Sequence, residues 1–249
     1  MCNHLQHPGM IDKNEEKRKY LLNQPEEFEI LEDAIDFQTQ SQYIEYSDTF
    51  ERGELTEEET INLSNMLYNT SLPVEGKKKG LTILAHLGSV TAFRLIEKYY
   101  KSPDNELKQW SALALQECKM FLENRLTDQV TGFVSGGLGG LKNRLRFYFL
   151  VLPLEDQIFT ETQKHVIKEE INLVAMNLNS IVESFDFYDT YVGFTTLMPM
   201  DVAVETLMAT AIKQCNELGE FVFEFYFATN QSIPGETEIK EIISIIRSD

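Results

Sequence analysis

The pattern of hydrophobic positions changes once along this chain, near residues 126–134. Before this border the apolar residues recur every three or four positions, which predicts helices throughout. After the border, runs of alternating apolar and polar positions are interleaved with amphipathic stretches, which predicts strands mixed with helices. We therefore expect disordered residues 1–12, a helical module over residues 13–127 and an α+β module over residues 128–249.

Two helix starts are marked in the helical module. A helix is predicted over residues 25–37, because Glu26 and Glu27 form an acidic first turn before apolar residues at helical spacing. Thr56 and Glu59 have the spacing of a capping box, in which the threonine hydroxyl and the glutamate each accept a backbone N–H. This arrangement predicts a helix that begins directly after Thr56.

Residues 76–127 resemble a known helical repeat. The run LAHLGSVTAFRLI at residues 84–96 is similar to the turn between two helices of a HEAT-type repeat, of the variety found in phycobilin-lyase-like proteins. Residues 110–115 are similar to the first helix of the next repeat. Gly88 lets the chain reverse, and small residues such as Ala85 and Ala112 let helix pairs stack closely. The resemblance implies a scaffold for packing or protein binding, without the lyase chemistry of that family.

The α+β module is predicted to contain six elements and an extra C-terminal helix. A capping box at Thr160 and Gln163 starts its first helix, and Asp201 and Gly219 bracket its second. The expected strands cover residues 145–152, 181–188, 191–197 and 221–227, and the last helix follows Pro234 and Gly235. The order strand, helix, strand, strand, helix, strand is that of a ferredoxin-like sandwich. The predicted fold class is therefore α+β, a HEAT-like helical module followed by a ferredoxin-like βαββαβ sandwich.

Alternation along residues 221–227 places four phenylalanines on one face of a strand, which we assign to the two helices of the sandwich. The other face of the sheet would then show Tyr148, Tyr191 and Tyr226. Such a face is too apolar to stay bare, so these tyrosines are predicted to form an interface with the helical module, a second copy of the chain or the last helix.

The glycine-rich segment 135–146 is the strongest candidate for a binding site, and two interpretations stay open. Its backbone amides and cations could hold a phosphate, or it could be a flexible hairpin or a connection between the modules. It lacks the Walker pattern and precedes a strand, which favours the connection. The candidate ligand-binding residues are Gly136, Gly137, Gly139, Gly140, Lys142 and Arg144.

Charge and composition restrict the partners. Acidic residues outnumber basic ones by 40 to 22, and the net charge of −18 argues against nucleic acid and anionic lipid as partners. No apolar run approaches the roughly 20 residues of a membrane helix. The sequence as given shows no secretory signal. Cys118 and Cys215 fall in register with apolar residues, which is typical of reduced core thiols in a cytoplasm.

The sequence contains no catalytic triad, nucleophile elbow or metal-ligand motif, so we predict no catalytic residue, no metal site and no cofactor. The leading hypothesis is a non-enzymatic protein-binding or regulatory adaptor in the bacterial cytoplasm, with a protein or a second copy of the chain as partner. One alternative is a sensor that binds a small molecule or phosphate with segment 135–146. A second alternative is an enzyme of unrecognised type.

Overall fold

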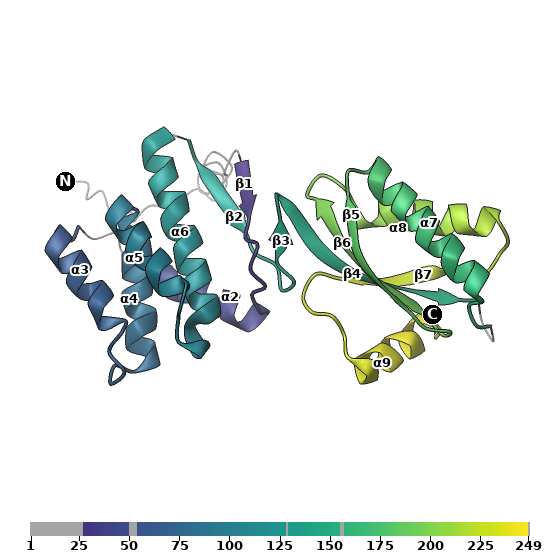
Figure 1. Ribbon diagram of the computed structural model, residues 1–249, viewed down its shortest axis with the longest axis horizontal. Helices are drawn as coiled ribbons and strands as arrows, with labels where there is room; N and C mark the ends of the chain where they lie inside the picture. The colour runs from purple at the N-terminus through teal and green to yellow at the C-terminus, as the bar shows by residue number, and fades with distance from the viewer. Residues whose placement is uncertain (1–26, 50–53, 128, 155–156, 249) are drawn as a thin grey trace, which may run out of the picture.

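The computed structural model describes residues 27–49, 54–127, 129–154 and 157–248 (Figure 1). The predicted disorder of residues 1–12 lies outside this part of the chain. The structure mixes helices and sheet, which confirms the α+β class. A helical unit on the left of Figure 1 meets a sheet-containing unit on the right, and strand β3 (Gly140–Leu141) lies where they join.

The helical unit contains five α-helices within the described residues. The longest, α6, packs against both α4 and α5 and buries Trp110, Leu113 and Cys118 in a shared core. The capping box is confirmed, because the Thr56 hydroxyl accepts the Glu59 N–H while the Glu59 carboxylate accepts the Thr56 N–H. The helices are α2 (Phe37–Ser47), α3 (Glu57–Met66), α4 (Val74–Leu87), α5 (Val90–Tyr100) and α6 (Lys108–Thr127).

The predicted helix over residues 25–37 is wrong. Strand β1 (Glu27–Ile30) occupies its first part and pairs in parallel with strand β2 (Thr131–Val134), while helix α2 begins only after the cap residue Asp36. The apolar spacing in this segment fits a helix, but pairing with a distant strand overrides it. Because β2 pairs with β1 and contacts α6, residues 131–134 lie with the helical unit.

The second unit is built on an antiparallel sheet with the spatial order β7-β4-β6-β5, and β3 pairs with the start of β4. Helices α7 and α8 cover one face, and helix α9 lies on the other (Figure 1). The elements are β4 (Arg144–Pro153), α7 (Glu161–Asn177), β5 (Ile181–Phe187), β6 (Val192–Pro199), α8 (Val204–Glu217), β7 (Val222–Thr229) and α9 (Glu236–Ile246).

The face assigned to the phenylalanines of residues 221–227 is wrong for Phe223, Phe225 and Phe227, whereas Phe221 is buried in the core beneath α7 and α8. Phe223 and Phe227 pack with α9, and Phe225 is 47% exposed. Tyr226 pairs with Val151 and faces α7 and α8 instead. Apolar side chains occupy both faces of this sheet, so alternation along one strand does not identify which face the sandwich helices cover.

Because the faces of β7 are exchanged relative to the prediction, the three candidate interface tyrosines lie on two different faces of the sheet. Tyr148 is buried on the α9 side, with its hydroxyl over the backbone of Gly193. Tyr191 is partly buried on the same side and stacks on Tyr188 with ring centres 4.4 Å apart. Tyr226 lies on the opposite face. Helix α9 therefore covers the face that we expected to need a partner.

Among the described residues, no helix combines the length and the apolar character that crossing a membrane requires.

Candidate functional site

The glycine-rich segment connects the two units, and its amides are already engaged. The N–H of Gly139 donates to the Gly136 carbonyl, and the N–H of Gly140 donates to the carbonyl of Glu32. The Leu138 N–H donates to the carbonyl of Asn230. A phosphate cradle needs amides that converge on open space, whereas these amides hold neighbouring loops together. The arrangement therefore favours the interpretation as a connection.

Close backbone packing explains two of these glycines. Gly139 has a φ of +67°, and a side chain there would overlap the carbonyl oxygen of Glu32. A side chain at Gly140 would overlap the carbonyl oxygen of Arg144. Both residues let strand β3 approach the segment after β1, so they shape the junction without binding a ligand through their own atoms.

The candidate arginine of this segment is also engaged. The guanidinium of Arg144 donates to the backbone and side-chain oxygens of Asn179, both at 2.9 Å. Its neighbour Arg146 pairs with Glu183 and donates to the carbonyl of Leu138. Lys142, by contrast, lines a cavity.

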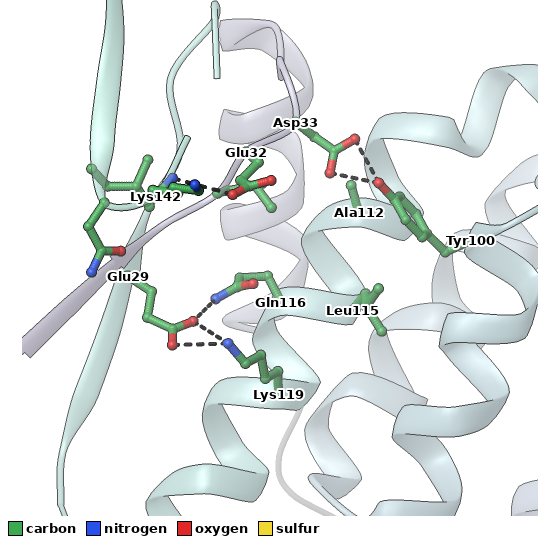
Figure 2. Close-up of a pocket in the computed structure, with 12 residues that line it drawn as sticks. Glu29, Glu32, Asp33, Tyr100, Ala112, Leu115, Gln116, Lys119 and Lys142 are labelled. Carbon is green, nitrogen blue, oxygen red and sulfur yellow. Dashed lines mark hydrogen bonds and ion pairs between the residues drawn. The ribbon is translucent and has the colours of Figure 1, made fainter. Parts of the chain in front are cut away.

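That cavity lies at the junction of the units and measures about 330 Å³. Strand β1 and the residues after it form one wall, helices α5 and α6 form the opposite wall, and the turn between β3 and β4 closes one side (Figure 2). Its lining carries three carboxylates and two ammonium groups around a small apolar patch at Ala112 and Leu115. The charged residues are Glu29, Glu32, Asp33, Lys119 and Lys142.

One ion pair of the lining is internally satisfied. Lys119 lies 2.7 Å from a carboxylate oxygen of Glu29, which also accepts a hydrogen bond of 2.7 Å from the Gln116 amide. Burial alone would raise the pKa of Glu29, but the hydrogen bonds from Lys119 and Gln116 lower it below its usual value. Both residues therefore stay charged at neutral pH and cancel each other.

Asp33 and Tyr100 close the far side of the cavity. The Tyr100 hydroxyl donates to the Asp33 carboxylate, whose two oxygens lie 2.9 and 2.8 Å away. Burial, followed by the contact with Asp33, raises the pKa of Tyr100 to about 12, so this phenol remains a donor. In Figure 2 the two side chains point toward each other across the upper edge of the site.

Lys142 is held in the cavity wall by an uncommon backbone. Lys142 has a φ of +48° and Asn143 a φ of +60°, so the β3–β4 turn uses left-handed conformations at two residues that are not glycine. The Lys142 N–H donates to the Glu32 side chain at 3.3 Å. Within the described residues, the ammonium of Lys142 forms no ion pair.

Sequence reasoning found Lys142 but missed the rest of the site. Glu29, Glu32 and Asp33 fall inside the segment interpreted as a helix, and no motif distinguishes Lys119 from the other lysines of the chain. The available signal was alternation at Phe28, Glu29 and Ile30, followed directly by Glu32 and Asp33. As for metal sites, no group of three or more His, Cys, Asp or Glu side chains suited to a metal ion occurs among the described residues.

Comparison with known proteins gives limited similarity. No family model and no curated protein matches the chain. Among solved structures, one similar protein is a REP-associated tyrosine transposase bound to a REP hairpin. The matched region covers 42% of this chain and 66% of the transposase chain, with 11% sequence identity and a TM-score of 0.32. A second is a candidate transposase from Deinococcus radiodurans R1. The matched region covers 44% of this chain and 93% of that transposase, with 11% sequence identity and a TM-score of 0.34.

These comparisons correct two expectations. The structural neighbours are transposases and not HEAT-type or phycobilin-lyase-like proteins, so the hypothesis of a protein-binding or regulatory adaptor is withdrawn. One neighbour was solved with a REP hairpin, so the exclusion of nucleic acid as a partner is withdrawn as well.

Proposed function

We propose that this chain binds a small zwitterionic molecule in the junction cavity, with the ligand's ammonium group near Glu32 and Asp33 and its acidic group near Lys142. The observation that carries this proposal is Lys142, an ammonium group without an ion-pair partner in the described residues, held at positive φ beside a cavity. Positive φ at Lys142 and Asn143 is what the two-residue hairpin turn between β3 and β4 requires, so this turn fixes where the Lys142 side chain emerges beside the cavity.

The charges of the lining support the ligand class. Glu29 and Lys119 neutralise each other, which leaves Glu32, Asp33 and Lys142 to meet a ligand. A dianion would meet two carboxylates, and a simple cation would leave the lysine uncompensated. A molecule with separated positive and negative groups matches both sets. Ala112 and Leu115 add an apolar surface that suits a short side chain, so an α-amino acid has the appropriate size and chemistry.

Two structural proposals accompany this function. The order of strands and helices in the second unit, and the strand order β7-β4-β6-β5, support a ferredoxin-like sandwich with α9 as an addition. The pairing of β2 with β1 supports a border between the units at the glycine-rich segment, a few residues after residue 127. The HEAT-like repeat over residues 76–127 stays a prediction.

Calorimetric titration with free amino acids of different side-chain size tests the function. We expect saturable binding of at least one of them, and loss of that binding when its amine is acetylated, because the acetylated compound lacks the positive group. A DNA hairpin is titrated in parallel at two salt concentrations. Hairpin binding that weakens steeply with salt, together with no response to any amino acid, would overturn the proposal in favour of nucleic acid.

Variants of Lys142 give the matched control. Lys142→Gly removes the ammonium and relieves the positive φ, so we expect lost binding together with a gain in stability of about 1 kcal/mol. Lys142→Arg keeps the charge and should retain binding. If Lys142→Gly binds the same amino acid with unchanged affinity, the ligand does not occupy this cavity.

A further inference from the structure

A second cavity lies within the helical unit, away from the β3–β4 turn, and measures about 260 Å³. Helix α2 supplies Tyr43 and Ser47, helix α6 supplies Leu113 and Glu117, and strand β2 supplies Phe133. Asp48, at the end of α2, is exposed at its edge. The described lining contains two carboxylates and no lysine or arginine, so its charge differs in kind from that of the junction cavity.

A buried carboxylate forms the floor of this cavity. Glu117 is 7% exposed, and its two oxygens accept hydrogen bonds of 2.8 Å from the Ser47 hydroxyl and 2.7 Å from the Tyr43 hydroxyl. Burial, followed by the neighbouring Glu117, raises the pKa of Tyr43 well above its usual range, so this phenol donates at any physiological pH. Each carboxylate oxygen has two lone pairs, and these donors leave acceptor capacity for a further group.

The neighbouring histidine does not turn this cluster into a hydrolytic site. His86 Nε2 lies 2.7 Å from the Ser47 hydroxyl and 3.5 Å from a Glu117 oxygen. In a serine–histidine–acid triad the acid binds Nδ1 while Nε2 faces the serine. Here the same ring nitrogen faces both residues, and the Ser47 proton is directed to Glu117. The geometry is therefore that of a binding site.

The other walls suit the non-polar part of a cation. Tyr43 and Phe133 contribute aromatic rings, and Leu113 and Ile44 contribute aliphatic surface. Aromatic rings attract ammonium groups through the negative potential over their faces, and this attraction increases when water is excluded. A carboxylate floor with aromatic and aliphatic walls recognises an amine that carries a short apolar tail.

We infer that the cavity between α2, α6 and β2 is a second ligand site, specific for a small alkylammonium ion whose charged end contacts Glu117. This site is independent of the proposed zwitterion site, because the two cavities share no lining residue. An α-amino acid is a poor ligand here, since its carboxylate would lie near the carboxylates of Glu117 and Asp48, and the described lining has no lysine or arginine to receive it.

Calorimetric titration of the full chain at pH 8 with butylammonium chloride tests the inference, with butan-1-ol as the neutral control of similar size. We expect saturable binding of butylammonium and none of butanol. Lys142→Gly should leave the butylammonium affinity unchanged, which separates this site from the junction cavity. Equal responses to butylammonium and butanol, or no response to either, would overturn the inference.

Three variants assign the contacts. Glu117→Gln keeps the shape of the side chain and removes its charge, so we expect a loss of affinity of about tenfold or more. Because Glu117 is buried, its replacement risks unfolding, and Phe133→Leu and the exposed Asp48→Asn provide safer tests. Each should weaken binding by roughly two- to fivefold, through the lost aromatic face and the lost surface charge respectively. Unchanged affinity in both, in folded protein, refutes the site.

Discussion

The two units of this protein differ in what they bury. Buried polar residues are frequent in the core of the helical unit, whereas the sheet unit buries few. In the helical unit they are Ser47, Thr60, Ser64, Lys77, Thr82, His86, Ser111 and Glu117, and in the sheet unit they are Lys164, Ser180, Thr195 and Thr196. Burying a polar group costs free energy unless it is hydrogen-bonded. Part of the buried polar set in the helical unit is one cluster, because Ser47 contacts both His86 and Glu117, whereas Thr60, Thr82 and Ser111 hydrogen-bond to the backbone of their own helices.

The two described cysteines are buried alike in both units. Cys118 in the helical unit and Cys215 in the sheet unit are both buried, as their register with apolar residues predicts. Burial raises the pKa of each thiol to about 12. Both cysteines therefore act as small apolar core residues, and neither adds reactive chemistry to its unit.

Replacing a core phenylalanine of the sheet unit should have the largest effect. Phe149 is fully buried between the sheet and helices α7 and α8, so Phe149→Ala should reduce the free energy of unfolding by about 3–5 kcal/mol. Phe225→Ala is the matched control and should cost less than about 1 kcal/mol, because half of that ring is exposed. Urea unfolding measures both. Similar losses in the two variants would show that β7 is placed wrongly.

The junction gives the next largest effect. Gly139→Ala combines a positive φ with overlap against the Glu32 carbonyl and should cost roughly 3 kcal/mol or more. At Gly136 the nearest atoms to a new methyl group lie 3.6 Å or more away, so Gly136→Ala should cost less than about 1 kcal/mol. Hydrogen exchange should show the loss of protection in strands β1 and β3 first. Equal losses of unfolding free energy in Gly139→Ala and Gly136→Ala would mean that β3 and the segment after β1 are not closely packed.

The two capping boxes allow a direct comparison of the units. Thr56→Ala and Thr160→Ala each remove one cap hydrogen bond at a helix start and should each cost about 1 kcal/mol. Local hydrogen exchange at α3 and α7 resolves the two effects. A cost confined to Thr160 would indicate that α3 frays without affecting the rest of the helical unit.

A pH dependence gives the smallest effect. Because the pKa of Glu29 is lowered in the fold, its contribution to stability is complete above its usual value of 4.5 and disappears as the pH falls through the lowered pKa. Glu29→Gln should therefore be less stable than the original chain at about pH 6, and this difference should shrink as the pH falls below 4.5. A stability difference that persists unchanged into acid would contradict the ion pair with Lys119.

Local signals were sufficient for much of the fold. The capping residues Thr56 and Thr160, the two-residue break at Asp189 and Thr190, and the alternation along β4 each act within a few residues, and the corresponding elements occur where predicted. Strand β1 was missed because its partner lies about a hundred residues away, and no local pattern encodes that pairing.

The site was less predictable for the same physical reason. Lys142 was identified from its neighbouring glycines, but Glu32 and Asp33 line the same cavity only because β1 pairs with β2, so that the residues after β1 lie beside the β3–β4 turn. Likewise, no sequence feature shows that Arg144 is bound to Asn179, since that contact depends on the end of helix α7. Lining residues drawn from four distant segments become a group only in the folded chain.

The parallel pairing of β1 with β2 has a consequence for synthesis of the chain. Strand β1 emerges from the ribosome before the helices of its unit, yet its hydrogen-bonding partner is made roughly a hundred residues later. Closing so long a loop is entropically costly and slows folding relative to the local helix contacts of α3 to α6. The helices can therefore assemble first, while the wall that carries Glu29 and Glu32 is added only once residue 134 is free. The junction cavity is completed as the first unit ends and the second begins.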